Sequence, residues 1–243
     1  MDEKQLFGLI GKNISYSFSK KYFTDKFNKL HLKNYKYEIF DLKEIDEIEN
    51  LLKNPEIKGL NITIPYKEKI VDYLDELSDE AKEIGAVNCI KIKDGKKIGY
   101  NTDAFGFEKT LLLQLKDFHK SALILGNGGA AKAVKYILKK HDISFKIIAR
   151  NTELNFENLT SDLVARSQLI IQCTPVGTFP NEQDYLKFPF EALTDKHLVI
   201  DLIYNPEYTQ FLKNAAKNNA KTLNGFYMLE QQAEKAWEIW KSQ

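Results

Sequence analysis

The chain has 243 residues, which suits one or two domains of ordinary size. Lys and Arg total 35 against 34 Asp and Glu, and this balance argues against a general nucleic-acid-binding surface. With only two cysteines and no apolar run near the ~20 residues that span a bilayer, the composition predicts neither a disulfide framework nor membrane contact, and favours a cytoplasmic globular protein.

The first part of the chain alternates between strand and helix patterns. Apolar and alternating runs predict strands, and apolar residues at helical spacing predict the helices between them. Pro65 ends one strand, and Asp94-Gly95 favours a type I′ turn in a hairpin. In order, we expect a strand at 6–10, a helix at 18–30, a strand at 35–39, a helix at 45–52, a strand at 60–64, a short helix at 77–84 and hairpin strands at 86–92 and 97–100.

The second part repeats the strand–helix alternation more regularly. Such alternation predicts parallel strands joined by right-handed crossovers, and so an α/β fold in two parts with a ligand cleft between them. The expected strands are 122–125, 145–149, 169–173 and 198–202, and the expected helices are 131–140, 207–218 and 226–240, with one short helix within 152–169.

The turn that follows the strand at 122–125 has the pattern of a dinucleotide-binding loop. Gly126 suits the tight turn, Gly128 lets the backbone approach a pyrophosphate, and Ala131 is a permitted small residue at the third position. The helix N-terminus then offers N–H groups to phosphate. The alternative is an ordinary strand-to-helix turn, but both flanking elements favour the cofactor interpretation.

The residue at the end of the next strand distinguishes the two nicotinamide dinucleotides. An acidic residue there would bind the ribose of NAD, whereas Arg150 occupies about that position here. Its guanidinium suits a phosphate, so the sequence favours NADP. The alternative is a surface arginine.

Two polar residues outside this loop are candidates for the chemistry. Lys67 follows a strand that Pro65 ends, and it could exchange a proton with a substrate hydroxyl. Asp103 follows the last hairpin strand and could accept a hydrogen bond from a substrate hydroxyl and hold Lys67 in position. Taken singly, Lys67 could be a solvated surface lysine, and Thr102 or Asp103 could simply cap a helix.

Taken in order, these segments resemble the shikimate dehydrogenase family from Gly8 to Trp240. Ile14-Ser15-Tyr16-Ser17-Phe18-Ser19 resembles the family's substrate loop, with Ser17 and Ser19 as the matching serines. Asn61-Ile62-Thr63-Ile64-Pro65-Tyr66-Lys67 is similar to its Asn-Val-Thr-x-Pro-x-Lys segment. Gly85-Ala86-Val87-Asn88, Asn101-Thr102-Asp103 and the segments 201–206 and 225–233 match further family motifs.

The resemblance implies a role for each matching position. Lys67 corresponds to the catalytic acid/base and Asp103 to its partner. The substrate-binding positions are Ser17, Ser19, Thr63, Asn88, Asp103, Tyr204 and Gln232. The cofactor-binding positions are Asp79, Gly126, Asn127, Gly128, Gly129, Ala130, Arg150, Leu202 and Gly225. No metal site is implied, and the histidines show no ligand spacing.

The chain departs from the family pattern at some of these positions. Asn127 stands where alanine is usual, and Asn13 and Lys20 replace prolines that flank the substrate loop. Glu153, Leu154 and Asn155 follow Arg150, where the family often has a second basic residue. This difference weakens the NADP preference without supplying the acid that NAD would need.

The resemblance implies two α/β domains. Residues 1–101 form the substrate domain, residues 102–224 form a Rossmann-like NADP-binding domain, and the C-terminal helix, 225–243, returns to the first domain. The implied reaction is the reversible NADPH-dependent reduction of 3-dehydroshikimate to shikimate, in aromatic amino-acid biosynthesis.

Three alternatives stay open at this point. The first is a quinate/shikimate dehydrogenase that uses NAD, and the second is a catalytically silent ligand-binding paralogue. The third is a dehydrogenase of the methylenetetrahydrofolate type, against which Ser17 and Ser19 count. The sequence does not set the oligomeric state.

Overall fold

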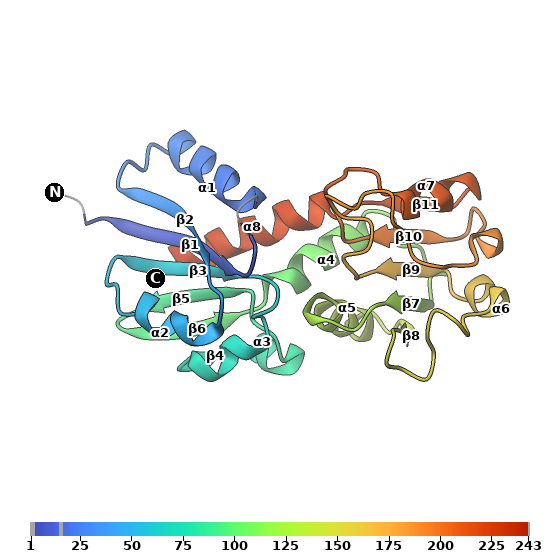
Figure 1. The fold of residues 1–243 in the computed structure, drawn as a ribbon, viewed down its shortest axis with the longest axis horizontal. Helices are drawn as coiled ribbons and strands as arrows, with labels where there is room; N and C mark the ends of the chain where they lie inside the picture. The colour runs from blue at the N-terminus through green and yellow to red at the C-terminus, as the bar shows by residue number, and fades with distance from the viewer. Residues whose placement is uncertain (1–2, 15–16, 243) are drawn as a thin grey trace. The chain divides into compact units, whose positions relative to one another are not determined.

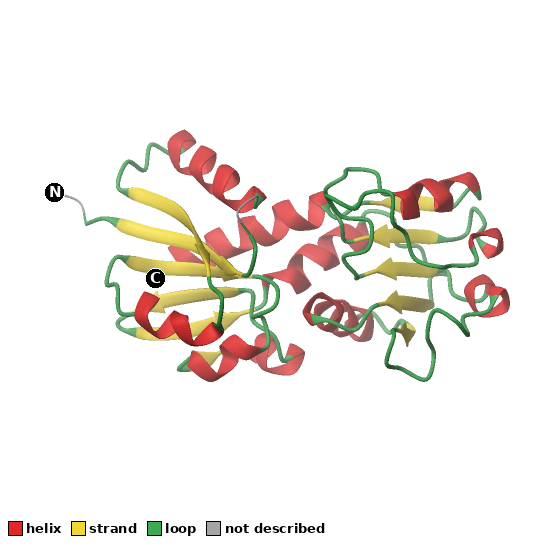
Figure 2. Cartoon of the chain, viewed as in Figure 1, coloured by secondary structure: helices red, strands yellow, loops and turns green. Residues whose placement is uncertain are grey.

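The computed structural model describes residues 3–14 and 17–242, so Ser15 and Tyr16 of the predicted substrate loop lie outside the described residues. The chain forms two compact units, one of residues 1–102 and 233–243, the other of residues 103–232. Each unit contains one β-sheet with helices packed on it (Figures 1 and 2). Two helices continue across the division, α4 (Thr102–Leu112) and α8 (Phe226–Lys241).

The first unit has a mixed six-stranded sheet in the order β2-β1-β3-β5-β6-β4. The first three strands pair in parallel, and β5 runs antiparallel to both β3 and β6. Asp94 and Gly95, both at positive φ, make the β5–β6 turn as the sequence predicts. The strands are β1 (Gln5–Gly11), β2 (Tyr35–Asp41), β3 (Ile57–Ile62), β4 (Glu76–Leu77), β5 (Cys89–Lys93) and β6 (Lys96–Tyr100).

Both faces of this sheet are covered. One face carries an aromatic cluster with residues from β1, β2, α1 (Phe18–Lys29) and the C-terminal part of α8. Trp240 of α8 donates from Nε1 to the Ile90 carbonyl at 3.0 Å, which fastens that part of α8 to the sheet. On the other face lie α2 (Ile48–Leu51), α3 (Asp79–Ile84) and the 3₁₀ turns η1 (Ile45–Glu47) and η2 (Lys69–Tyr73).

The second unit has a fully parallel five-stranded sheet in the order β11-β10-β9-β7-β8. Its strands are β7 (Ser121–Leu125), β8 (Ser144–Ile148), β9 (Leu169–Gln172), β10 (Leu198–Asp201) and β11 (Lys221–Leu223). Its remaining helices are α5 (Gly129–Lys140), α6 (Ser161–Ala165), η3 (Phe190–Ala192) and α7 (Gln210–Lys217). Residues of α6 and α7 pack on one face with the inner side chains of β7, β9 and β10.

The strand order of this second sheet fixes where a ligand would bind. The chain runs outward from β7 to β8 and then returns past β7 to β9, so its direction of winding reverses between β7 and β9. In doubly wound sheets, ligands bind beyond the carboxyl ends of the strands at such a reversal. The α/β fold with a Rossmann-like second part is therefore confirmed. The reversal makes the turn after β7 the expected ligand-binding position of this sheet.

The elements differ from expectation mainly at their ends. The short strands β4 and β11 were not predicted, and β3 ends at Ile62 rather than at residue 64. The helix expected from residue 207 begins at Gln210, because the Thr209 side chain accepts the Leu212 N–H and caps it. Over residues 3–14 and 17–242, no helix combines the length and apolarity that crossing a bilayer requires.

Candidate functional site

The predicted substrate-binding segments of the first unit meet at one edge of its sheet, by which we mean the side where the strand ends lie. This edge holds the carboxyl ends of β1, β3 and β6 and the start of β5. The Thr63 N–H donates to the Ile10 carbonyl, and the Val87 N–H donates to the Lys67 carbonyl, both at 2.8 Å. Backbone hydrogen bonds therefore fix the 63–67 turn against β1 on one side and the approach to β5 on the other.

Asn88 fastens the start of α4 to this edge. Its Oδ1 accepts the Thr102 N–H at 2.6 Å, and the Thr102 hydroxyl lies 3.0 Å from its Nδ2. Both side chains are buried. Asn88 thus accepts a backbone N–H in the first turn of α4. Asp103, the next residue and also buried, lies in the first turn of α4.

The two serines lie at the start of α1. Ser17 is the N-cap, and its hydroxyl accepts the Ser19 N–H at 3.2 Å. Ser19 is almost fully buried, at 9% exposure, whereas Ser17 is half-buried. Ser17 therefore has a structural task besides any ligand contact. Asp79, expected near the cofactor, lies in the first turn of α3 with its carboxylate exposed, 3.4 Å from Lys82 Nζ.

Within the second unit, α4 and α8 bring Asp103 and Gln232 to neighbouring turns. Gly106 follows Asp103 by one helical turn, and a Cβ built on it would lie 3.2 Å from Gln232 Cβ. The Gln232 side chain donates from Nε2 to the Leu229 carbonyl at 2.9 Å. Two of the predicted substrate-binding side chains are thus supplied by one helix pair.

The predicted phosphate-binding turn lies at the winding reversal. Gly126 has φ +108°, and a side chain there would press on Thr174, which follows β9. Gly128 is the N-cap of α5, and an added Cβ would meet nothing within 4 Å. The first turn of α5 holds no acidic residue. An open, uncharged helix N-terminus of this kind suits a pyrophosphate.

The remaining predicted cofactor residues line the same edge of the second sheet. Arg150 is exposed two residues beyond β8, and Leu202 follows β10 directly. Gly225, which lies beyond β11, donates its N–H to the Ile203 carbonyl at 2.9 Å. Asn127 Oδ1 accepts from Lys135 Nζ at 3.2 Å, which brings a positive charge to the phosphate turn.

Asp201 organises the loop that carries Leu202 and Tyr204. Its carboxylate accepts the Ile203 N–H at 3.0 Å and the Thr209 hydroxyl at 2.7 Å. The side chain is completely buried, and burial raises the pKa of Asp201 to about 6. The hydrogen bonds from Thr209 and Ile203 oppose this rise. The loop after β10 therefore depends on a buried acid.

Sequence reasoning missed Tyr37, whose hydroxyl donates to Asn61 Oδ1 at 2.8 Å. Asn61 was expected on a polar strand face, but that face is buried under the aromatic cluster, and Asn61 is 5% exposed. The signal that could have located Tyr37 is its place in an alternating strand pattern, because a tyrosine hydroxyl needs a partner when the side chain is buried.

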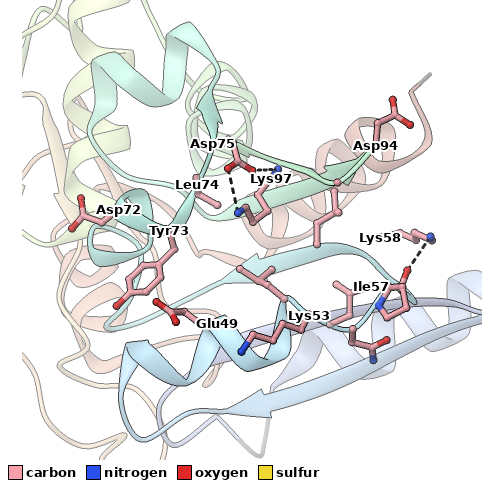
Figure 3. A pocket seen from close by; sticks show the side chains of 15 residues that line it. Glu49, Lys53, Ile57, Lys58, Asp72, Tyr73, Leu74, Asp75, Asp94 and Lys97 are labelled. Atoms are coloured by element: carbon pink, nitrogen blue, oxygen red, sulfur yellow. Dashed lines mark hydrogen bonds and ion pairs between the residues drawn. The ribbon is translucent and has the colours of Figure 1, made fainter.

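One hollow of the first unit lies away from these residues. It measures about 660 Å³ and is lined by residues such as Ile57, Lys58, Tyr73 and Asp94 (Figure 3). These residues border the start of β3 and the β5–β6 turn, at the sheet edge opposite Lys67 and Asn88. Among the described residues, no three His, Cys, Asp or Glu side chains gather as metal ligands.

Known proteins resemble this chain over nearly its whole length. A family model described as the shikimate dehydrogenase substrate binding domain matches residues 9–90. A protein named shikimate dehydrogenase (NADP(+)) from Methanococcus maripaludis is 39% identical to this chain, with 99% of this chain and 92% of the relative covered. The chain belongs to the shikimate dehydrogenase family.

Solved structures of the family share the fold. A shikimate dehydrogenase crystallised with NADP+ has a TM-score of 0.87 and 36% identity, with 98% of this chain and 90% of that chain covered. A quinate dehydrogenase from Corynebacterium glutamicum in complex with NAD also has a TM-score of 0.87, at 25% identity, with 99% and 94% covered. The family fold therefore accommodates either dinucleotide.

Proposed function

We propose that this protein is an NADP-dependent shikimate dehydrogenase, which reversibly reduces 3-dehydroshikimate to shikimate. The observation that carries the proposal is the 39% identity, over 99% of the chain, to a shikimate dehydrogenase (NADP(+)). The retention of the family's lysine and aspartate, as Lys67 and Asp103, is in keeping with an active enzyme rather than a silent paralogue. The product belongs to aromatic amino-acid biosynthesis.

Shikimate is a ring with one carboxylate and several hydroxyls, and the proposed contacts divide accordingly. Ser17 and Ser19, at the start of α1, bind the carboxylate as hydrogen-bond donors. Thr63, Asn88, Asp103 and Gln232 bind the ring hydroxyls, and Tyr204 lies in the loop after β10. Because hydroxyls both donate and accept, amide and carboxylate side chains suit them.

Several features of the second unit suit a bound dinucleotide. The open Gly128, the N-terminus of α5 and the guanidinium of Arg150 would hold the pyrophosphate and the 2′-phosphate of NADP. Leu202 and Gly225 are proposed to lie near the nicotinamide, and Asp79 is proposed as a further cofactor contact. When bound, NADPH supplies the hydride.

The protein's own chemical task is to manage one proton. As the ketone carbon is reduced, its oxygen becomes an alkoxide, and we assign Lys67 as the group that gives this oxygen a proton. In the oxidative direction, Lys67 takes the hydroxyl proton. Asp103, as an acceptor for a substrate hydroxyl, orients the ring for transfer.

The test is absorbance at the reduced-nicotinamide band with shikimate plus NADP, then with NAD, and with quinate in place of shikimate. Reduction of NADP by shikimate is the expected result, with slower reduction of NAD. The NAD-linked quinate activity is a specific second candidate, because the quinate dehydrogenase has an equal TM-score and Glu153, Leu154 and Asn155 stand where the family often has a second basic residue. Faster turnover of quinate with NAD would favour that candidate, and no turnover would favour a silent paralogue.

A further inference from the structure

A chain of polar side chains runs through the aromatic face of the first sheet. Tyr37 on β2 donates to Asn61 on β3 at 2.8 Å, across the intervening β1. Asn61 Nδ2 in turn donates to the Asn88 carbonyl at 3.4 Å. This series of hydrogen bonds therefore links Tyr37 with Asn88, a residue to which we assign a ring hydroxyl of the substrate.

The Tyr37 ring is held firmly. It is 2% exposed and stacks on Phe23 of α1, with 4.6 Å between ring centroids and an 11° angle between planes. Burial raises the pKa of Tyr37, so the hydroxyl keeps its proton and remains a donor. A fixed hydroxyl in a dry setting imposes a definite orientation on the groups that it bonds.

A hydroxyl at this position has a property that no apolar side chain shares. It donates its one proton to Asn61 Oδ1, and the Asn61 amide is thereby held with Nδ2 toward the Asn88 carbonyl. Tyr37 thus sets the orientation of the Asn61 amide.

We propose that Tyr37 is a positioning residue for the substrate, whose hydroxyl holds Asn61 in the orientation that keeps Asn88 in place for a ring hydroxyl. Asn61 passes the constraint to Asn88, which itself anchors Thr102. This inference rests on the proposed shikimate dehydrogenase function. It concerns binding of the carbon substrate, not the dinucleotide or the proton transfer.

The first test is Tyr37→Phe, which removes one oxygen and keeps the ring. We expect the KM for shikimate to rise about tenfold, the effect of losing one buried hydrogen bond. The kcat and the KM for NADP should stay near wild type, because the lost interaction aids ground state and transition state alike. The matched control is Tyr73→Phe, whose hydroxyl bonds Asp46 at 2.6 Å beside the far hollow, and its KM values should not change.

A double-mutant cycle separates positioning from a general loss of packing. If Tyr37 acts through Asn61, Tyr37→Phe will raise the KM less in an Asn61→Ala background than in wild type. Effects of the two substitutions that multiply to within about twofold would overturn the proposal. So would a folded Tyr37→Phe enzyme whose KM for shikimate is unchanged.

A second variant, which removes the next hydrogen bond in the series, controls for a folding defect caused by Tyr37→Phe. Asn61→Ala leaves the ring intact and removes the next link, so it should also raise the KM for shikimate with little effect on the KM for NADP. A wild-type KM in Asn61→Ala would also count against the proposal. Failure of the wild-type protein itself to oxidise shikimate would instead overturn the proposed function, so the two failures are distinguishable.

Discussion

Gly106 of α4 packs directly against the Met228 carbonyl of α8, and a Cβ on Gly106 would lie 2.5 Å from that oxygen. Real side chains do not approach a backbone atom so closely, so only glycine permits this spacing of the two helices. Asp103 lies one turn before the contact and Gln232 one turn after Met228. The spacing of Asp103 and Gln232, two proposed substrate contacts, thus depends on the absence of a side chain at Gly106.

Gly106→Ala should therefore destabilise the protein and weaken shikimate binding. Alanine favours a helix over glycine by about 1 kcal/mol, but overpacking against backbone costs about 1–3 kcal/mol, so the clash should win. Thermal unfolding should show a lowered Tm, and the KM for shikimate should rise. A variant as stable as wild type would show that the helices can separate without penalty.

Lys67→Ala should lower kcat by at least about a hundredfold, the low end for loss of a general acid/base. The KM for shikimate should change much less, because the proton moves only in the transition state. Lys69→Ala, two residues along and exposed in η2, is the matched control and should retain wild-type turnover. Near-normal kcat in Lys67→Ala would remove this lysine from the mechanism.

Arg150→Ala should raise the KM for NADP by about tenfold or more, because charge-assisted bonds to a phosphate are lost. The KM for NAD, which has no 2′-phosphate, should scarcely change. Arg166→Ala controls for loss of a surface arginine, because Arg166, just after α6, pairs with Asp162 of that helix. Equal effects on both dinucleotides would place Arg150 away from the 2′-phosphate.

Asp201 should make stability depend on pH in a direction unusual for a carboxylate. Its pKa rises from 3.8 to about 6 on folding, so between these values the folded protein binds more protons than the unfolded chain. The Asp201 contribution is therefore fully favourable below about pH 4 and is lost as pH rises through about 6, an effect of roughly 2–3 kcal/mol at neutral pH.

Asp201→Asn should remove this dependence, because the amide is neutral and its oxygen still accepts the Ile203 N–H. Urea unfolding of both proteins at pH 5 and pH 7 measures it. The variant should gain stability relative to wild type at pH 7 and gain less at pH 5. A stability difference that is the same at both values would mean that Asp201 titrates in its ordinary range.

Sequence patterns predicted those elements whose structure depends mainly on residues that are neighbours in the chain. The apolar run of β7, the glycine turn and the amphipathic α5 are adjacent in the chain, and each favours its structure without distant contacts. The strands β4 and β11 have two and three residues, too few for any periodicity to show. Tertiary pairing alone makes them strands.

The environment of the site residues could not be predicted in the same way. The alternation of Asn61 and Thr63 with apolar residues indicated a polar strand face, because the rings that cover it come from distant elements. Tyr37 lies 24 positions from Asn61, and Trp240 belongs to the last helix. Asn88 likewise reaches Thr102 across 14 positions. Such contacts depend on the fold, and the roles of the site residues stay predictions.

The short turn at Asp94 and Gly95 has an influence beyond its own loop. Asn88 and Thr102 flank the two hairpin strands, so they meet only when Cys89 pairs with Tyr100, and the two-residue turn sets that alignment. A slip of one residue would part the amide from the first N–H of α4 and rotate the helix start. The exposed Asp94-Gly95 turn at one end of the sheet thereby determines where α4, which carries Asp103, begins at the other end.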